Sequence, residues 1–244
     1  MYNHKQLKAI TCNDRFIFVN AGAGSGKTTV MIERMKRLIH EGVSEEDILG
    51  LTFSKEAAMQ MKERLNIENV FISTFHSFCY QHLEGFDVIP KSVPFSKEFL
   101  LKVSLYKNKM GQKPFFYQRY ISYLKKHKFI DYDDMLIRFI SIKDVYAYKH
   151  ILIDEFQDTN FLQISVLLKL IHYDTFVFVV DNHHIPYRFS RSMFSIEEER
   201  RLFYVGITRA RHALYFIHYK YDKNVKLSKF IDEISDNQVF KAIK

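Results

Sequence analysis

The sequence predicts an α/β protein built around a parallel sheet, and three observations lead to that prediction. In Arg15–Val30 (RFIFVNAGAGSGKTTV) an apolar strand runs through small residues into a helix. Short apolar runs then alternate with helical patterns along the chain. Finally, Ile151–Glu155 (ILIDE) is an apolar strand that ends at two adjacent carboxylates. Ligand sites in parallel sheets lie at the carboxyl ends of the strands, so these stretches predict one continuous binding edge.

Residues 21–26 (AGAGSG) predict a phosphate-binding loop. Glycine tolerates the positive φ angles that let backbone N–H groups surround a phosphate, and the following helix points the positive end of its dipole at the same anion. In such a loop Lys27 would reach the β- and γ-phosphates and Thr28 would ligate Mg²⁺. Ala21 occupies the first glycine position of the pattern G-x-x-x-x-G-K-[ST], so the match is to a variant. The alternative is a Gly-rich turn that binds no ligand.

Helices and strands alternate over both ends of the chain. Residues 2–10 predict a helix start with Leu7 and Ile10 facing inward, and Thr28–His40 predicts a helix that ends at Gly42. Further strands are predicted at 48–53, 70–74, 151–153, 175–181 and around 213–218. Further helices are predicted at 55–65, with Ser54 as N-cap, at 161–171 and at 227–234.

The alternation is lost between Glu84 and Lys149, where a Lys-, Phe- and Tyr-rich region punctuated by prolines predicts inserted helices. Its longest periodic piece is 115–129 (FFYQRYISYLKKHKF). Basic residues interleaved with aromatics could follow a nucleic-acid backbone, and an amphipathic helix with a solvated lysine face explains the same pattern. The acidic stretch DYDDML, from Asp131, is predicted to cap a helix start.

Composition bears on partners and location. The net charge of +8 favours polyanions, nucleic acid first, and an aromatic content of 16% supplies faces for base stacking, although a general bias toward Lys, Ile, Phe and Tyr explains it equally. Cys12 and Cys79 lack the spacing of a disulfide framework or zinc site, and His183 and His184 lack further ligands. No apolar run reaches about 18 residues and the N-terminus lacks a signal-peptide core, which predicts a cytoplasmic location.

Together these motifs resemble superfamily 1 DNA helicases of the UvrD/Rep/PcrA type. The resemblance covers most of residues 2–230 and is carried, in order, by AGAGSGKTT, LTFSKEAAMQMKERL, ISTFHSF, DYDDML, ILIDEFQD, YRF and EEERRLFYVGITRAR. It implies a RecA-like ATP-binding core over 1–83 and 146–192, a mainly helical insertion over 84–145, and a truncated remnant of a second RecA-like domain over 193–244. ATP and Mg²⁺ are the implied cofactors, and single-stranded or partly duplex DNA is the implied partner.

The resemblance assigns roles in hydrolysis. Lys27 and Thr28 match the phosphate and Mg²⁺ residues, and Asp154 matches the metal carboxylate. Glu155 matches the base for the attacking water, and Arg209 the arginine finger that stabilises charge in the transition state.

The resemblance also assigns the binding residues. Gln6 matches the glutamine that reads the adenine edge, and Gln157 matches a contact near the γ-phosphate. The implied nucleotide-binding set is Gln6, Ala21, Gly22, Ala23, Gly24, Ser25, Gly26, Lys27, Thr28 and Thr29. The implied base-stacking or wedging set is Phe53, Phe75, His76, Tyr187 and Phe189.

Two departures from the family pattern affect the expected activity. Where the family resembles GDDDQSIYRF, this chain reads VDNHHIPYRF, so that His184 replaces the glutamine that couples nucleotide state to DNA. Between Phe189 and Glu197, seven residues stand where the family carries most of its second motor domain. Unwinding in this family requires two lobes that close and open on ATP.

Three hypotheses follow from these matches and departures. The first is an ATP-dependent single-stranded DNA motor or helicase with the family's 3′ to 5′ polarity, compact or assembled from two chains, with Arg209 acting in trans or a partner chain supplying the missing lobe. The second is a one-lobe remnant that binds ATP and DNA without unwinding. The third, an unrelated P-loop enzyme such as a small-molecule kinase, is disfavoured by the DEFQD and TRAR boxes.

Overall fold

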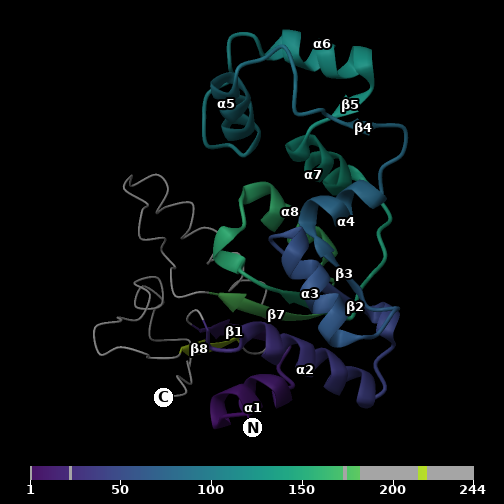
Figure 1. The fold of residues 1–244 in the computed structure, drawn as a ribbon, viewed down its shortest axis with the longest axis vertical. Helices are drawn as coiled ribbons and strands as arrows, with labels where there is room; N and C mark the ends of the chain where they lie inside the picture. The colour runs from purple at the N-terminus through teal and green to yellow at the C-terminus, as the bar shows by residue number, and fades with distance from the viewer. Residues whose placement is uncertain (1, 22–23, 173–174, 182–213, 219–244) are drawn as a thin grey trace, which may run out of the picture. The chain divides into compact units, whose positions relative to one another are not determined.

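The computed structural model describes residues 2–21, 24–172, 175–181 and 214–218, and the fold is given for these alone. The chain divides into two units, which are described separately (Figure 1). The sheet unit contains Met1–Thr74, Ala147–Thr159 and Ile171–Lys244, and the helical unit contains Phe75–Tyr146 and Asn160–Leu170. No described helix is long and apolar enough to cross a membrane.

A six-stranded sheet forms the centre of the sheet unit. Its strands are β1 (Phe16–Asn20), β2 (Ile48–Thr52), β3 (Phe71–Thr74), β6 (His150–Ile153), β7 (Phe176–Asp181) and β8 (Leu214–His218). They lie in the order β3-β2-β6-β7-β1-β8, and every pairing is parallel. The predicted parallel α/β fold is therefore confirmed. All six strands end at the same side, called here the carboxyl edge.

Strand β8 comes from residues 193–244, which the family resemblance assigns to a remnant of a second domain. That division of the chain stays a prediction. In the structure β8 pairs with β1, with Phe16 opposite Leu214 and Asn20 opposite His218. An apolar strand from this late part of the chain thus joins the same sheet as the strand that precedes the glycine-rich loop.

Among its described residues the sheet unit contains three α-helices, of which α1 and α2 lie side by side (Figure 1). They are α1 (His4–Thr11), α2 (Lys27–His40) and α3 (Lys55–Leu65), and two short 3-10 helices cover Glu45–Asp47 and Phe156–Asp158. Apolar residues at helical spacing, including Met31 and Met35, are fully buried in the core beneath α2. Gly50 on β2 permits this packing, because a Cβ there would lie 2.9 Å from the Met35 side chain.

The helical unit contains five helices in its described residues. They are α4 (Phe75–Gln81), α5 (Lys97–Lys107), α6 (Tyr117–His127), α7 (Tyr132–Ser141) and α8 (Phe161–Leu170), joined by a short parallel pair, β4 (Asp87–Val88) and β5 (Phe129–Ile130). The predicted helical region began at 84 and ended at 145, whereas residues 75–83 and 160–170 also fall in this unit. Whether the unit is an insertion in a RecA-like core stays a prediction.

A buried ion cluster ties α5, α6 and α7 together. The Lys107 side chain is 2% exposed, and its Nζ lies 2.5 Å from Asp131 Oδ2 and 2.7 Å from Asp134 Oδ1. The Tyr120 hydroxyl donates to Asp131 Oδ2 at 2.7 Å. Burial alone would lower the pKa of Lys107, but the two carboxylates raise it above its ordinary value. Asp131 also accepts from the backbone N–H of Asp134, which confirms it as the predicted helix cap.

His150, the first residue of β6, predicts a pH dependence of stability. Burial, and then the charge of Arg34, lower its pKa from 6.5 to about 4. Between these pH values His150 binds a proton in the unfolded chain but not in the folded chain. The free energy of unfolding therefore falls as pH falls from 6.5 toward 4. His150→Asn should flatten this part of the profile of unfolding free energy, measured by urea unfolding at several pH values.

The matched control for this prediction is His40→Asn at the exposed end of α2. It should keep the wild-type slope, because an exposed side chain is solvated in both states. An unchanged slope in His150→Asn would show that other groups account for the acid sensitivity.

Candidate nucleotide site at the carboxyl edge

The glycine-rich loop connects β1 to α2 at the carboxyl edge. Gly24 and Gly26 have φ angles of 74° and 83°, which side chains other than glycine rarely adopt. Gly26 is also the N-cap of α2, and a Cβ there would lie 3.0 Å from Gln6 Nε2. The loop therefore needs glycine for its backbone path and for the approach of Gln6.

The structure brings Lys27 and Glu155 together. Glu155 follows the end of β6 in the left-handed backbone region, at φ 50°. Strands β6 and β1 flank β7, so the residue after the loop and the residue after β6 meet at the same edge. Lys27 Nζ lies 3.3 Å from Glu155 Oε1, with side-chain exposures of 9% and 34%. The carboxylate of Glu155 thus lies next to Lys27, at the position where the lysine could hold an anionic ligand.

Asp154 is the more buried of the two carboxylates, at 5% exposure. Burial, and then the neighbouring charge of Glu155, raise its pKa, while the backbone N–H of Glu155, Lys27 and a hydrogen bond with Thr28 lower it. A buried carboxylate beside a hydroxyl and a second carboxylate offers the oxygen ligands that a hard cation prefers.

No group of three or more His, Cys, Asp or Glu side chains is placed to hold a metal in the described part of the chain. Mg²⁺ in nucleotide sites is held by one or two carboxylates together with substrate phosphates, so Asp154 and Thr28 fit this ion without a larger cluster.

Ser25 and Gln6 present polar groups toward a ligand. Ser25 Oγ is buried and has no hydrogen-bond partner among the described residues, so a phosphate oxygen in the loop would satisfy it. Gln6 Nε2 donates to the Ser25 carbonyl at 2.9 Å, and Gln6 Oε1 accepts from the Asn3 N–H at 2.9 Å. An amide carries two N–H groups and two lone pairs, so one donor and one acceptor of Gln6 remain for a ligand.

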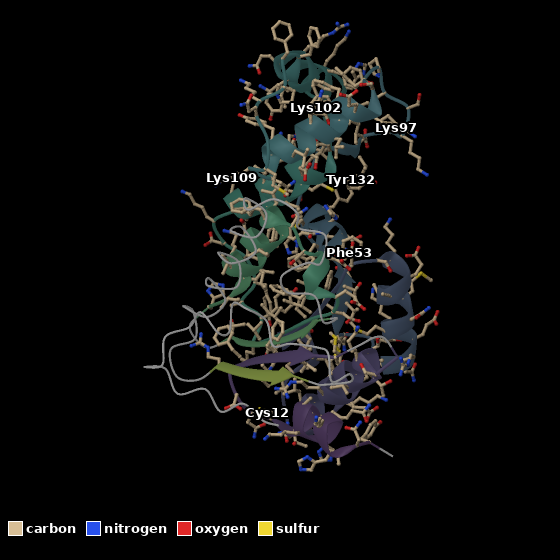
Figure 2. All side chains as sticks on the ribbon, turned by 90° about the vertical axis from the view of Figure 1, so that its left-hand side faces the viewer. Cys12, Phe53, Lys97, Lys102, Lys109 and Tyr132 are labelled. Carbon is tan, nitrogen blue, oxygen red and sulfur yellow. The ribbon has the colours of Figure 1, made fainter. Side chains whose placement is uncertain are left out.

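The predicted DNA-contacting residues lie in different surroundings. Phe53, directly after β2 at the carboxyl edge, is 57% exposed (Figure 2). Phe75, the first residue of α4, is 2% exposed, so its ring offers no free face in this conformation. His76 packs edge-to-face on Tyr132 at 5.4 Å between ring centroids, and burial lowers its pKa. The three roles stay predictions, with Phe53 exposed, His76 partly buried and Phe75 buried.

Some predicted residues lie outside the described part of the chain. These are Gly22, Ala23, His184, Tyr187, Phe189 and Arg209, together with the side chain of Gln157. Conversely, Arg64 of α3 was not anticipated: its Nη2 donates to Thr29 Oγ1 at 2.7 Å. Nothing in the sequence signals this pair, because the two residues belong to separate helices.

The fold and the site together define an α/β protein with the strand-loop-helix arrangement of P-loop nucleotide-binding proteins. Two family models match the chain: that of the UvrD/REP helicase N-terminal domain over residues 2–92, and that of the UvrD-like helicase C-terminal domain over residues 169–221. The chain belongs to the UvrD-like helicase family.

Curated relatives agree with this assignment. A probable DNA helicase of Mycoplasma pneumoniae is 27% identical, over 80% of this chain and 49% of the relative. A probable DNA helicase II homolog of Mycoplasma genitalium is 30% identical, over 76% and 36%. The ATP-dependent DNA helicase PcrA of Bacillus subtilis is 26% identical, over 69% and 31%. This chain therefore spans half or less of the length of the relatives it matches.

Proposed function

We propose that this protein hydrolyses ATP and couples hydrolysis to binding and 3′ to 5′ translocation on single-stranded DNA. The observation that carries the proposal is the meeting of Lys27 and Glu155, 3.3 Å apart, beside Asp154 and the glycine-rich loop. A phosphate-binding cation, a hydroxyl and two carboxylates at the end of adjacent elements are the groups that NTP hydrolysis requires. The helicases named among the relatives support the choice of ATP and DNA.

In this proposal each residue of the edge has a separate task. ATP phosphates displace Glu155 from Lys27, which then holds the β- and γ-phosphates. Thr28 and Asp154 would hold Mg²⁺, which neutralises phosphate charge. Glu155, released, accepts a proton from the water that attacks the γ-phosphorus, and the bond to the β-phosphate oxygen breaks. Arg209 and Gln157 keep the roles implied by the family resemblance.

The proposed domain plan follows the family. Residues 1–83 and 146–192 would be the RecA-like core, residues 84–145 the helical insertion, and residues 193–244 a remnant of the second motor domain. Either a second copy of this chain would supply Arg209 in trans, or a different chain would supply the missing lobe.

One observation favours the alternative, a one-lobe protein that binds ATP and DNA without unwinding. Strands β7 and β8 fall within the match to the C-terminal domain, and β1 within the match to the N-terminal domain. All three are neighbours in one sheet. Both matched segments thus contribute strands to one sheet, and the only other sheet among the described residues is the short pair β4–β5, which is too small to act as a second motor lobe.

One experiment distinguishes the two. ATP hydrolysis is measured with and without a single-stranded oligonucleotide, and strand displacement is measured on the same preparation with 3′- and 5′-tailed duplexes. Hydrolysis stimulated by DNA with displacement from a 3′ tail supports the motor. Stimulated hydrolysis without displacement supports the one-lobe alternative. A wild-type chain with no hydrolysis under either condition overturns the enzyme proposal.

Phe53→Ala should weaken binding of single-stranded DNA about 5- to 100-fold, because an exposed ring at the carboxyl edge can stack one base, worth about 1–3 kcal/mol. Fluorescence anisotropy with a labelled oligonucleotide measures this loss. Met59→Ala, which truncates a 61% exposed side chain on α3, is the matched control and should leave affinity unchanged. Equal affinity for Phe53→Ala and the wild type would remove Phe53 from the DNA site.

A further inference from the structure

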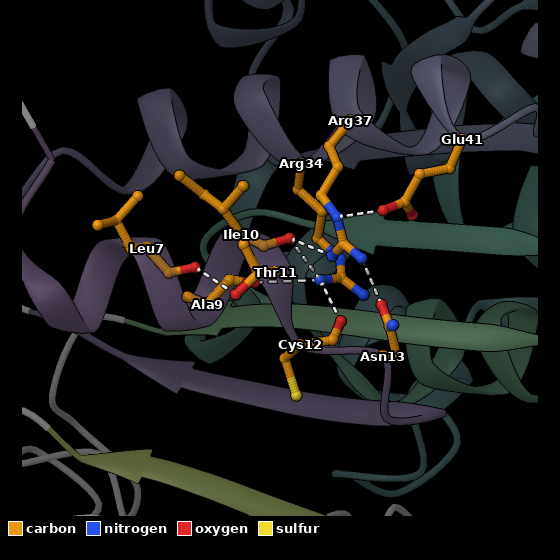
Figure 3. A network of polar contacts seen from close by, with 9 residues as sticks. All are labelled: Leu7, Ala9, Ile10, Thr11, Cys12, Asn13, Arg34, Arg37 and Glu41. Carbon is orange, nitrogen blue, oxygen red and sulfur yellow. Dashed lines mark hydrogen bonds and ion pairs between the residues drawn. The ribbon is translucent and has the colours of Figure 1, made fainter.

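Two arginines of α2 hold the carbonyl end of α1 (Figure 3). Arg34 Nη1 donates to the carbonyl oxygens of Ala9, Ile10 and Cys12, at 3.1, 3.2 and 2.7 Å. The last carbonyls of a helix have no partner within the helix, so a cation placed there anchors its end. Arg34 and Arg37 are called here the arginine clamp.

Arg37 reinforces this anchor from one turn further along α2. Its Nη1 donates to the Ile10 carbonyl at 2.8 Å, its Nη2 to Asn13 Oδ1 at 2.5 Å, and its Nε to Glu41 Oε1 at 2.7 Å. Arg34 is the more deeply placed of the two, at 3% exposure. Burial lowers its pKa to about 10, which leaves the guanidinium charged at neutral pH.

The opposite end of α1 carries Gln6, whose amide reaches the glycine-rich loop through Ser25. An eight-residue helix is marginal by itself, so its orientation depends on what holds it. Gln6 lies about one helical turn from Ile10, and at roughly 6–9 Å from the clamp a tilt of about 10° would move its amide by about 1–1.5 Å. Such a shift would break hydrogen bonds of ordinary length.

The remaining donor and acceptor of Gln6 match adenine better than guanine. Adenine presents an N6–H donor beside the N7 acceptor, which pair with an amide oxygen and an amide N–H. Guanine presents two acceptors, O6 and N7, so the amide oxygen would face another oxygen. The Asn3 N–H, which bonds to Gln6 Oε1, fixes the orientation of the amide and therefore this preference.

We propose that Arg34, supported by Arg37, is a positioning residue that fixes α1 so that Gln6 selects adenine over guanine. Helix α2 begins with Lys27 and carries Arg34 two turns later. One rigid helix therefore places both the phosphate contacts and, through the clamp and α1, the base contact. This inference rests on the proposed hydrolysis of ATP and adds the residues that set its base selectivity.

The test is a double-mutant cycle with Mg·ATP and Mg·GTP as substrates. The wild type should prefer ATP in kcat/KM, and Gln6→Ala should reduce this preference about ten-fold or more. Arg34→Lys keeps the charge but cannot reach all three carbonyls, and should reduce the preference similarly, through KM for ATP with kcat nearly unchanged. In Gln6→Ala/Arg34→Lys the preference should fall no further, because both changes remove one function.

Two further variants complete the experiment. Arg37→Met leaves Arg34 in place and should reduce the preference in the same direction by a smaller factor, so the proposal can be tested even if Arg34→Lys folds poorly. Lys36→Ala, on the exposed side of α2, is the control and should leave the preference unchanged. If Arg34→Lys and Arg37→Met both keep the wild-type preference, or their effects add to that of Gln6→Ala, this inference alone is overturned. A wild type that neither binds nor hydrolyses ATP overturns the proposed function as well.

Discussion

Glu155→Gln should lower the rate of ATP hydrolysis about 100- to 10,000-fold while ATP binding is retained. The amide keeps the shape of the side chain but cannot accept the proton of the attacking water. It also removes the charge that pairs with Lys27 at 3.3 Å, so the lysine remains available to phosphate. Phosphate release in steady state measures the rate, and titration with a fluorescent ATP analogue measures binding.

Two further variants are compared with Glu155→Gln: Lys27→Ala, which removes the phosphate-binding cation, and Glu63→Gln, which is the matched control. Lys27→Ala should lose binding and hydrolysis together, because it removes the cation proposed to hold the β- and γ-phosphates. Glu63→Gln changes an exposed carboxylate on α3 and should change neither quantity. If Glu155→Gln hydrolysed ATP at the wild-type rate, another group would have to accept the proton of the attacking water, and Glu155 would not be the base.

Lys107→Met should lower the free energy of unfolding by about 3–5 kcal/mol. The variant leaves the buried Asp131 and the partly buried Asp134 without the cation that neutralises them, and a buried charge without its partner is strongly destabilising. Urea unfolding followed by far-UV circular dichroism measures the loss. The deficit should shrink as pH falls, because burial raises the pKa of Asp134 and its protonation removes an unpaired charge.

Lys102→Met is the matched control for this prediction. It lies on the same helix, α5, is 60% exposed at its side chain and pairs with Glu98 at 2.7 Å. An exposed ion pair of this kind contributes little, so the free energy of unfolding should stay close to that of the wild type. Equal losses in the free energy of unfolding for Lys102→Met and Lys107→Met would show that the buried cluster stabilises the unit no more than an exposed ion pair does.

Features encoded over a few neighbouring residues could be predicted from the sequence. The helix over 55–65 and its N-cap Ser54 are found as predicted, because apolar spacing and a capping hydroxyl are local signals. The six strands of the large sheet were placed to within a residue or two for the same reason, whereas the two-residue strands β4 and β5 were not predicted. The loop and the two carboxylates after β6 were also found, because strand ends in a parallel sheet share one edge.

Features that depend on distant partners could not be predicted. The sequence does not distinguish Lys107 from the other lysines of its Lys-rich region, because its partners Asp131 and Asp134 lie at the start of another helix. Nothing in the sequence indicates that Arg34 is buried against α1, because the carbonyls that it contacts belong to another helix. The family resemblance implied that Phe75 stacks on a base, whereas in the structure its ring is buried. A pattern along one segment does not say what packs on it.

The position of β1 between β7 and β8 has a consequence for the order of folding. Phe16 pairs with Val177 and with Leu214, so both neighbours of this early strand come from the last third of the chain. During synthesis β1 and the glycine-rich loop that follows it are made before β7 and β8, so β1 can pair only after these strands have been synthesised. Pairings between residues far apart in sequence also form slowly. The phosphate loop is therefore completed late, and a nucleotide that binds only the finished loop would stabilise the whole sheet.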